Sequence, residues 1–234
     1  MHSSALEPDA LVPFDPASPE SEASINDLLD NLVEKGWYVW PNAIEPELCQ
    51  ALLEEASEHH QEGELKRAGI GRGDEHQLNR DIRRDKIKWL DGSTPTQQAY
   101  LAKMADLQFR LNRELFLGLF EYECHFALYQ PGDFYKKHYD SFRGQATRIV
   151  TTVLYLNPEW QPGKGGELVI YKDEEDTQPT LVSPYFGTLA VFMSEEILHE
   201  VLPTLQSRYS ITGWFRLNNM QGNQVDPPTQ LLTY

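Results

Sequence analysis

Cysteine is scarce in this sequence, with only Cys49 and Cys124 among 234 residues. Two cysteines cannot build a disulfide framework, and their spacing fits neither a zinc ribbon nor a redox motif. Long apolar runs are also missing, and the first 24 residues lack the basic segment and apolar stretch of a signal peptide. We therefore expect a protein of the reducing cytoplasm that has no membrane partner.

Basic residues are outnumbered, because 20 Lys and Arg stand against 36 Asp and Glu, which gives a formal net charge of −16. Such a charge repels a phosphate backbone and releases none of its counterions, so we expect no nucleic-acid partner. Two explanations of the charge stay open. One is solubility, and the other is electrostatic steering of a basic protein partner.

The length and the 40% apolar content are typical of one folded domain with tails. Residues 1–23 mix Pro, Glu, Ser and Ala with few large apolar residues, which predicts a flexible leader. The domain is expected over residues 24–217. Residues 218–234 are polar and receive no predicted structure.

Apolar residues recur at helical spacing in three segments of the N-terminal half. These segments are residues 24–36, with Ser24 as the expected cap and Gly36 at the end, residues 46–63, and residues 95–120. Short strands are expected at 37–40 and 86–90. The region 63–94 is rich in glycine and charge, and glycines 69, 71 and 73 predict either the hinge of a closing lid or a surface insertion.

Beyond Tyr122 the apolar period changes to two. Strand-like runs follow at residues 126–129, 148–156, 167–171, 189–193 and 209–215, separated by Pro-Gly, Asn-Pro and Gly-Gly turns. Helices followed by about eight short strands predict an α+β, mainly β protein, with a sheet sandwich or jelly roll backed by the N-terminal helices.

A candidate metal site begins with His138 and Asp140, at the end of a strand-like run. Alternation in a strand points residues i and i+2 to one face, although for this pair alone a strand-end ion pair is the favoured interpretation. His199 lies in a later strand-like run. Two histidines and one carboxylate leave three positions open on iron(II), whereas zinc more often recruits a further ligand.

Arg208 follows on the next expected strand. An arginine inside a barrel is unfavourable unless an anion meets it, and its planar fork matches a carboxylate. Tyr155 would add a phenolic hydrogen bond to the same anion. A surface salt bridge for Arg208 and a core position for Tyr155 are the alternatives. Taken with the histidines, the pattern indicates a metal with a free face and a cation that seats a dicarboxylic keto acid.

The stretch 126–216 resembles the prolyl 4-hydroxylases of the 2-oxoglutarate oxygenase superfamily. The matching motifs are the HxD of His138 and Asp140, Tyr155-Leu156-Asn157, Gly165-Gly166, and the series His199, Arg208, Thr212 and Trp214. Residues 81–92 are similar to the substrate-covering finger loop and strand of this family, within the expected finger region 63–94. The chain looks like a bacterial relative of the oxygen-sensing hydroxylases that modify hypoxia-inducible factor, over about residues 24–216.

The resemblance implies a double-stranded β-helix in a catalytic domain that uses Fe(II), 2-oxoglutarate and O2, with ascorbate as a further candidate. It implies trans-4 hydroxylation of a prolyl residue in a protein substrate, with succinate and CO2 as coproducts. The implied metal-binding and catalytic residues are His138, Asp140 and His199. The implied contacts to 2-oxoglutarate are Arg208, Tyr155, Tyr129 and Thr212. The implied contacts to the substrate are Tyr135, Trp214, Asp85 and Arg148, with Asp85 paired to Arg148.

Alternative functions stay open at this stage. The same iron site could hydroxylate another side chain or a free metabolite. A jelly-roll binding module with a structural or vestigial metal site is the alternative from another class, although an intact ligand set together with Arg208 argues against it. Residues 67–80 depart from the animal pattern, so the substrate protein is left open, as is oxygen sensing. We expect a monomer.

Overall fold

The computed structural model describes residues 19–68, 79–141, 147–218, 220–221 and 224–225. Its helices are α1 (Pro19–Lys35), α2 (Pro46–Gln61) and α3 (Pro95–Leu115). Its strands are β1 (Trp37–Trp40), β2 (Lys66–Arg67), β3 (Lys86–Trp89), β4 (Glu121–Tyr129), β5 (Tyr135–His138), β6 (Arg148–Tyr155), β7 (Leu168–Tyr171), β8 (Thr180–Val182), β9 (Leu189–Met193), β10 (Leu198–Val201), β11 (Arg208–Arg216), β12 (Met220–Gln221) and β13 (Gln224–Val225).

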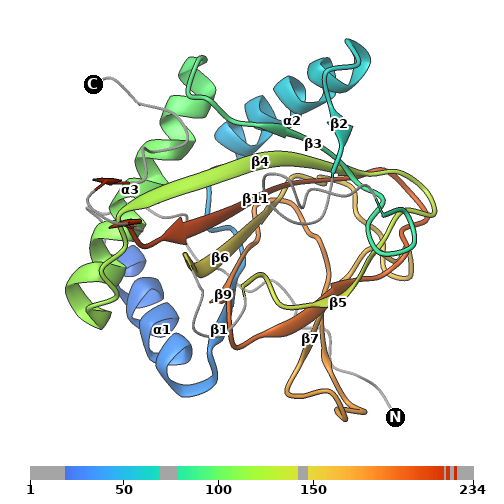
Figure 1. Cartoon of the computed structure of the whole chain (residues 1–234). Helices are drawn as coiled ribbons and strands as arrows, with labels where there is room; N and C mark the ends of the chain where they lie inside the picture. The colour runs from blue at the N-terminus through green and yellow to red at the C-terminus, as the bar shows by residue number, and fades with distance from the viewer. Residues whose placement is uncertain (1–18, 69–78, 142–146, 219, 222–223, 226–234) are drawn as a thin grey trace.

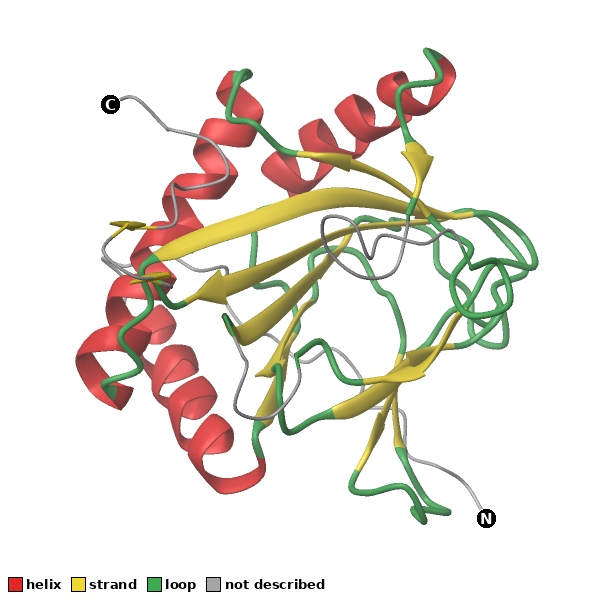
Figure 2. Ribbon diagram, viewed as in Figure 1, coloured by secondary structure: helices red, strands yellow, loops and turns green. Residues whose placement is uncertain are grey.

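Two antiparallel sheets form the core of the fold. The large sheet has the strand order β1-β9-β6-β11-β4-β3-β2, and the small sheet has the order β5-β10-β7-β8. The helices cover the outer side of the large sheet, and the small sheet lies on the opposite side (Figures 1 and 2). The predicted mainly β jelly roll backed by N-terminal helices is therefore confirmed. None of the described helices is long and apolar enough to cross a bilayer.

The first helix begins earlier than predicted. Pro19 suits a first helical turn, so Ser24 lies inside α1, where it is buried, and the predicted Ser24 cap is wrong. The predicted end is confirmed. Gly36 has a φ of +80° and donates its N–H to the carbonyl of Leu32 at 3.1 Å, a conformation that glycine adopts without steric strain.

Helix α3 is shorter than the predicted helix over 95–120. It starts as expected, because the Thr94 hydroxyl accepts the N–H of Gln97 at 3.1 Å. It ends at Leu115 because Phe116 adopts a left-handed conformation with a φ of 54°. The Asn112 side chain then binds the backbone N–H and C=O of Leu119 at 2.6 and 2.8 Å, which folds the chain back onto the helix.

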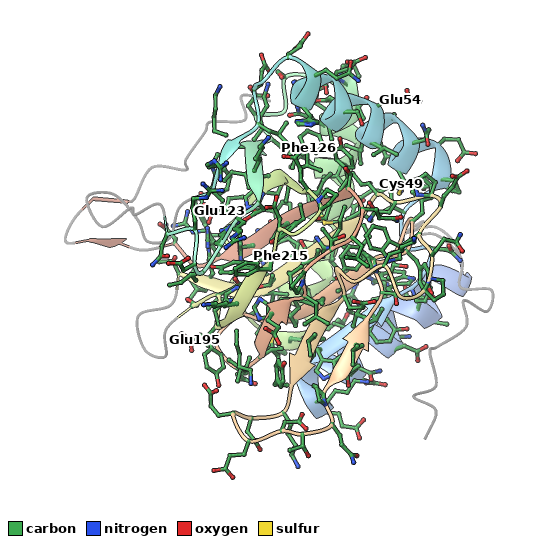
Figure 3. All side chains as sticks on the ribbon, turned by 90° about the vertical axis from the view of Figure 1, so that its right-hand side faces the viewer. Cys49, Glu54, Glu123, Phe126, Glu195 and Phe215 are labelled. Atoms are coloured by element: carbon green, nitrogen blue, oxygen red, sulfur yellow. The ribbon has the colours of Figure 1, made fainter. Side chains whose placement is uncertain are left out.

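Alternation along the strands separates two apolar layers. Phe126 of β4 packs with Cys49 of α2 and Phe215 of β11 in the layer between the helices and the large sheet (Figure 3). The next residue, Ala127, faces the small sheet and packs in the layer that also holds Val153. The candidate site lies in this second layer, between the sheets.

Strands β2 and β8 are short and were not predicted from the sequence. Strand β2 pairs with β3, so the finger region is a hairpin in the described residues. The proposed glycine hinge at 69–73 and most of the leader lie outside the described residues. In the tail, where no structure was predicted, β12 pairs with β13.

Candidate active site

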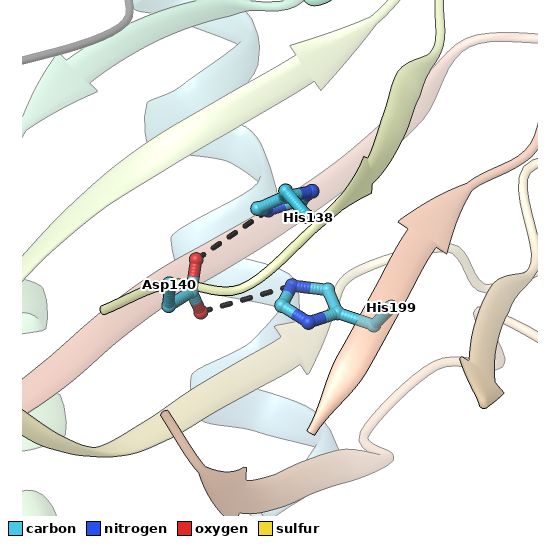
Figure 4. Close-up of side chains that lie close together, drawn as sticks. All are labelled: His138, Asp140 and His199. Atoms are coloured by element: carbon cyan, nitrogen blue, oxygen red, sulfur yellow. Dashed lines mark ion pairs between the residues drawn. The ribbon is translucent and has the colours of Figure 1, made fainter. Parts of the chain in front are cut away.

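Strand pairing in the small sheet brings the two candidate histidines together. His138 of β5 lies directly opposite His199 of β10, and their ring centroids are 4.2 Å apart. Asp140 lies beyond the end of β5, so strand alternation does not place its carboxylate as predicted. Its Oδ1 nevertheless lies 3.5 Å from Nε2 of His138 and its Oδ2 lies 3.7 Å from Nε2 of His199 (Figure 4).

Hydrogen bonds set the orientation of both rings. Nδ1 of His138 contacts the carbonyl of Lys136 at 2.7 Å, and Nδ1 of His199 contacts that of Ile197 at 2.9 Å. A carbonyl only accepts, so each Nδ1 carries the proton and each Nε2 keeps a free lone pair. The Thr151 hydroxyl donates to Asp140 Oδ2 at 2.8 Å. One atom from each of the three side chains lies within 4.8 Å of the other two, which suits one small cation.

The electrostatics favour the ligand forms of His199 and Asp140 at neutral pH. Burial, and then the charge of His138, lower the pKa of His199 to about 4. Burial alone would raise the pKa of Asp140, but the charges of His199, His138 and Arg148 hold it well below its usual range. A neutral imidazole and an ionised carboxylate are the forms that bind a divalent metal.

Arg208 is a buried cation, with 1% of its surface exposed. Its Nε donates to the carbonyl of Gly166 at 2.8 Å and its Nη1 donates to Ser210 Oγ at 3.2 Å. Neither partner is charged, and no carboxylate among the described residues forms an ion pair with it. A buried guanidinium without a counter-ion is unfavourable, so this position is suited to an anionic ligand.

Tyr155 adds a second polar group for that ligand. Its ring centroid lies 5.0 Å from the Arg208 guanidinium carbon, and its hydroxyl is buried without a hydrogen-bond partner in the described residues. Burial raises its pKa to about 12, although the Arg208 charge opposes the shift, so the phenol stays protonated and can donate. Tyr129 lies opposite Arg208 in the β4–β11 pair, with its ring 4.9 Å from the guanidinium.

One cavity between the sheets connects the candidate metal ligands with Arg208, whereas Tyr155, Asp85 and Arg148 are not among its lining residues. The predicted site residues that line it are Tyr129, Tyr135, His138, Asp140, His199, Arg208, Thr212 and Trp214. Tyr135 stacks on His138, with ring centroids 3.6 Å apart and planes at 17°. Lining residues that the sequence did not reveal are Arg83, Thr151, Val153, Leu168, Phe192 and Val201. The apolar members look like ordinary core residues in the sequence. Arg83 lies in residues 81–92, which resemble the substrate-covering finger loop and strand of the family.

The predicted ion pair between Asp85 and Arg148 is wrong. Asp85 accepts two hydrogen bonds from Arg83, at 2.6 and 2.8 Å. Arg148 pairs with Glu123 at 2.7 Å and lies 3.5 Å from the ring centroid of Trp214. Strand order explains the partner of Arg148, because β4 and β6 both flank β11. Glu123 lies opposite Trp214 on one side of β11, and Arg148 lies opposite Arg216 on the other side.

Comparison with known proteins agrees with this site. The sequence model of the 2OG-Fe(II) oxygenase superfamily matches residues 124–216. A Pseudomonas putida prolyl-4-hydroxylase superposes with a TM-score of 0.75 at 41% identity, over 82% of this chain and 98% of that one. A Trichoplax adhaerens prolyl hydroxylase, solved with a peptide fragment of the oxygen degradation domain of hypoxia-inducible factor, gives a TM-score of 0.75 at 28% identity, over 83% and 90%.

Among curated proteins, Homo sapiens Egl nine homolog 1 is 32% identical over 146 residues, which cover 58% of this chain and 34% of that protein. The chain thus spans about a third of the length of this relative. The fold, the candidate metal-ligating set and these matches place the chain in the 2OG-Fe(II) oxygenase superfamily. Within that class the chain belongs to the prolyl 4-hydroxylase family.

Proposed function

We propose that this protein hydroxylates a prolyl residue of a protein substrate at the trans-4 position, consuming O2 and 2-oxoglutarate and releasing succinate and CO2. The observation that carries the proposal is the shared cavity. The imidazoles of His138 and His199, the carboxylate of Asp140 and the guanidinium of Arg208 all line it, and Arg208 is buried without a counter-ion in the described residues. A metal ion would occupy the site formed by the imidazoles and the carboxylate, and a dicarboxylate that binds the metal would supply the counter-ion of Arg208.

The residues of the chain divide the work. His138, Asp140 and His199 would hold Fe(II), which when bound supplies the activation of O2 that is coupled to oxidative decarboxylation of 2-oxoglutarate. The fork of Arg208 would bind the distal carboxylate, and the hydroxyl of Tyr155 would donate to it. Tyr129 and Thr212 would line the same pocket.

The walls of the cavity limit the access of water. Val153, Leu168 and Phe192 are buried apolar residues between the sheets, and the Phe192 ring lies 4.7 Å from that of His199. Fixed positions and a dry enclosure direct the oxidation to the bound substrate, without an acid or base from the protein.

The substrate would approach past Tyr135 and Trp214, with Arg148 and Asp85 fixing the surrounding surface. Arg148 is held over Trp214 by Glu123, and Asp85 holds Arg83 at the edge of the cavity. The prolyl target is supported by the two solved prolyl hydroxylases, which this chain matches over most of its length. A peptide in the Trichoplax enzyme supports a protein substrate here.

We place the enzyme in the cytoplasm, as a monomer that acts on protein and not on nucleic acid. Cys49 and Cys124 are free and buried, which suits a reducing compartment. Oxygen sensing and stimulation by ascorbate complete the proposal. The similarity to the hydroxylase solved with the hypoxia-inducible factor peptide supports the first of these.

The test is anaerobic reconstitution with Fe(II) and 2-oxoglutarate, followed by air and candidate proline-containing proteins. We expect succinate in step with addition of one oxygen atom to a proline, located by mass spectrometry, and neither product from the His138→Ala variant. Oxygen on another side chain or on a free metabolite would replace the prolyl assignment. Iron and 2-oxoglutarate binding without any succinate would favour a non-catalytic binding module.

A further inference from the structure

A second cavity adjoins the active site on the side of the finger hairpin. Its volume is about 110 Å³. It is lined by Arg67, Ala68, Asn79, Arg80, Arg83, Arg84 and Asp85. Arg83 lines both this cavity and the active-site cavity. The two cavities are therefore separated by no more than the Arg83 side chain.

The charge of this region is opposite to that of the whole protein. Residues 66–68 and 79–88 contain seven Lys or Arg and two Asp, in a chain whose net charge is −16. Glu64 pairs with Lys88 from just outside these ranges, so the local balance is 7 − 3 = +4. One of the two acids, Asp85, is occupied by Arg83 in a two-hydrogen-bond ion pair. Positive charge is thus concentrated beside the active site of an acidic protein.

Three arginines of the second cavity have no acidic partner within the described part of the chain. They are Arg67 on β2, Arg80, and Arg84. The Arg84 guanidinium lies 4.6 Å from the Phe134 ring centroid, and its Nε donates to the carbonyl of Arg80 at 2.8 Å. These contacts hold the guanidinium in place without neutralising it. Like charges gathered round one hollow repel each other, and an anion in the hollow relieves that repulsion.

We propose that this arginine cavity binds Asp or Glu side chains that flank the target proline, so that the enzyme selects acidic segments of its protein substrate. The inference rests on the proposed prolyl hydroxylation. Planar guanidinium groups match carboxylates in a bidentate geometry, which makes the contact selective as well as attractive. It departs from the expectation that the net negative charge would steer a basic partner.

Local charge decides the sign of this preference. In physiological salt, charges are screened beyond a Debye length of about 8 Å, so a bound peptide experiences mainly the nearby arginines. An acidic chain that places no carboxylate in the cavity lies against the acidic remainder of the surface, which repels it at short range. The arrangement therefore confers selectivity rather than a general affinity for acidic protein.

The first test uses the iron-loaded enzyme with 2-oxoglutarate, air and a peptide library in which a central proline has randomised flanks. Hydroxylated peptides are identified by mass spectrometry. We expect Asp and Glu to be enriched at a fixed distance on one side of the hydroxyproline. Acidic residues at the frequency of the starting library would overturn the inference.

The second test compares variants on one selected peptide and its Asn/Gln counterpart. The readout is the ratio of kcat/KM for the acidic peptide to that for the neutral peptide. Replacing Arg67, Arg80 and Arg84 by Gln should lower this ratio about tenfold, since several partly exposed charge pairs are lost together. Arg113→Gln, which removes an exposed arginine of α3, should leave the ratio unchanged.

Charge reversal separates recognition from a structural role. Arg84→Glu should shift the library enrichment from Asp and Glu toward Lys and Arg, which misfolding cannot produce. An unchanged ratio in the triple variant, or unchanged enrichment in Arg84→Glu, would contradict the assignment. If the library yields no hydroxyproline, prolyl hydroxylation itself fails. Fluorescence anisotropy with labelled Glu-rich and Gln-rich peptides then still tests whether the arginine cavity binds acidic side chains, and equal binding of the two peptides would overturn that inference.

Discussion

His138 and His199 face each other across the antiparallel pair of β5 and β10, and both present Nε2 to the carboxylate of Asp140. Each ring is held from behind by a hydrogen bond from Nδ1 to a backbone carbonyl. The site is consequently built on the hydrogen-bonded frame of the small sheet. The fold itself therefore sets the orientation of these candidate ligands, which would reduce the entropy lost on metal binding.

Removal of one ligand should abolish metal binding and leave the fold intact. For His199→Ala we expect Fe(II) affinity to fall by more than about a hundredfold, because two remaining ligands hold a divalent ion poorly. Metal content after anaerobic loading and gel filtration measures the effect. His60→Ala, on α2 away from the cavity, is the control. Full iron occupancy in His199→Ala would refute the ligand assignment.

Arg208→Ala should weaken 2-oxoglutarate binding without a comparable loss in stability. Truncating a buried charge that pairs with a ligand carboxylate is expected to raise the 2-oxoglutarate KM about a hundredfold. Because the charge has no counter-ion in the described residues, its removal from the apoprotein also relieves a desolvation penalty. Titration calorimetry and thermal unfolding separate the two effects, with Arg113→Ala as control. Unchanged 2-oxoglutarate binding would contradict the role.

Gly166→Ala tests whether the backbone positions Arg208. An added Cβ would lie 3.1 Å from Arg208 Cδ and 3.1 Å from Thr204 Oγ1, at a φ of +68°. We expect a raised KM for 2-oxoglutarate, because the arginine must shift, and a loss of about 1–2 kcal/mol from backbone strain. Gly163→Ala is a matched control, since its φ is +79° and an added Cβ would meet nothing within 4 Å. It should share the strain but not the altered KM.

His125 should make stability depend on pH. Burial, followed by the charge of Arg83, lowers its pKa from 6.5 to about 3. Between pH 6.5 and pH 3, His125 is therefore protonated in the unfolded chain but neutral in the native state. The free energy of unfolding falls as the pH drops through this range. Between pH 6.5 and pH 5 this one group is expected to remove about 2 kcal/mol.

The measurement is urea unfolding of wild type and His125→Phe at both pH values. Phenylalanine keeps an aromatic ring beside Trp89 and Trp214, whose ring centroids lie 5.1 and 5.4 Å from that of His125. The variant should lose less stability on acidification than the wild type. Equal losses in the two proteins would show that His125 does not carry the effect.

Several features were predictable from the sequence because they depend on near neighbours in the chain. Gly36 ends α1, Pro95 begins α3, and period-two runs become strands, since helix-end signals and alternation act over a few residues. The types of the candidate ligands were equally visible, because few residue sets leave iron(II) open positions. The length of α3 was not predictable from such local patterns. The chain reverses its direction after Leu115, and the Asn112 side chain holds this reversal by binding the backbone of Leu119.

By itself, the sequence determined the approximate positions of the helices and of most long strands, the mainly β class and the side chains available to a metal and to a dicarboxylate. Only the tertiary structure decided which of them meet. The opposition of His138 to His199, the pairing of Arg148 with Glu123 instead of Asp85, and the hollow between Arg67 and Arg84 all depend on strand order and register. Contacts between residues distant in the chain follow from how sheets pack, and no local pattern encodes that packing.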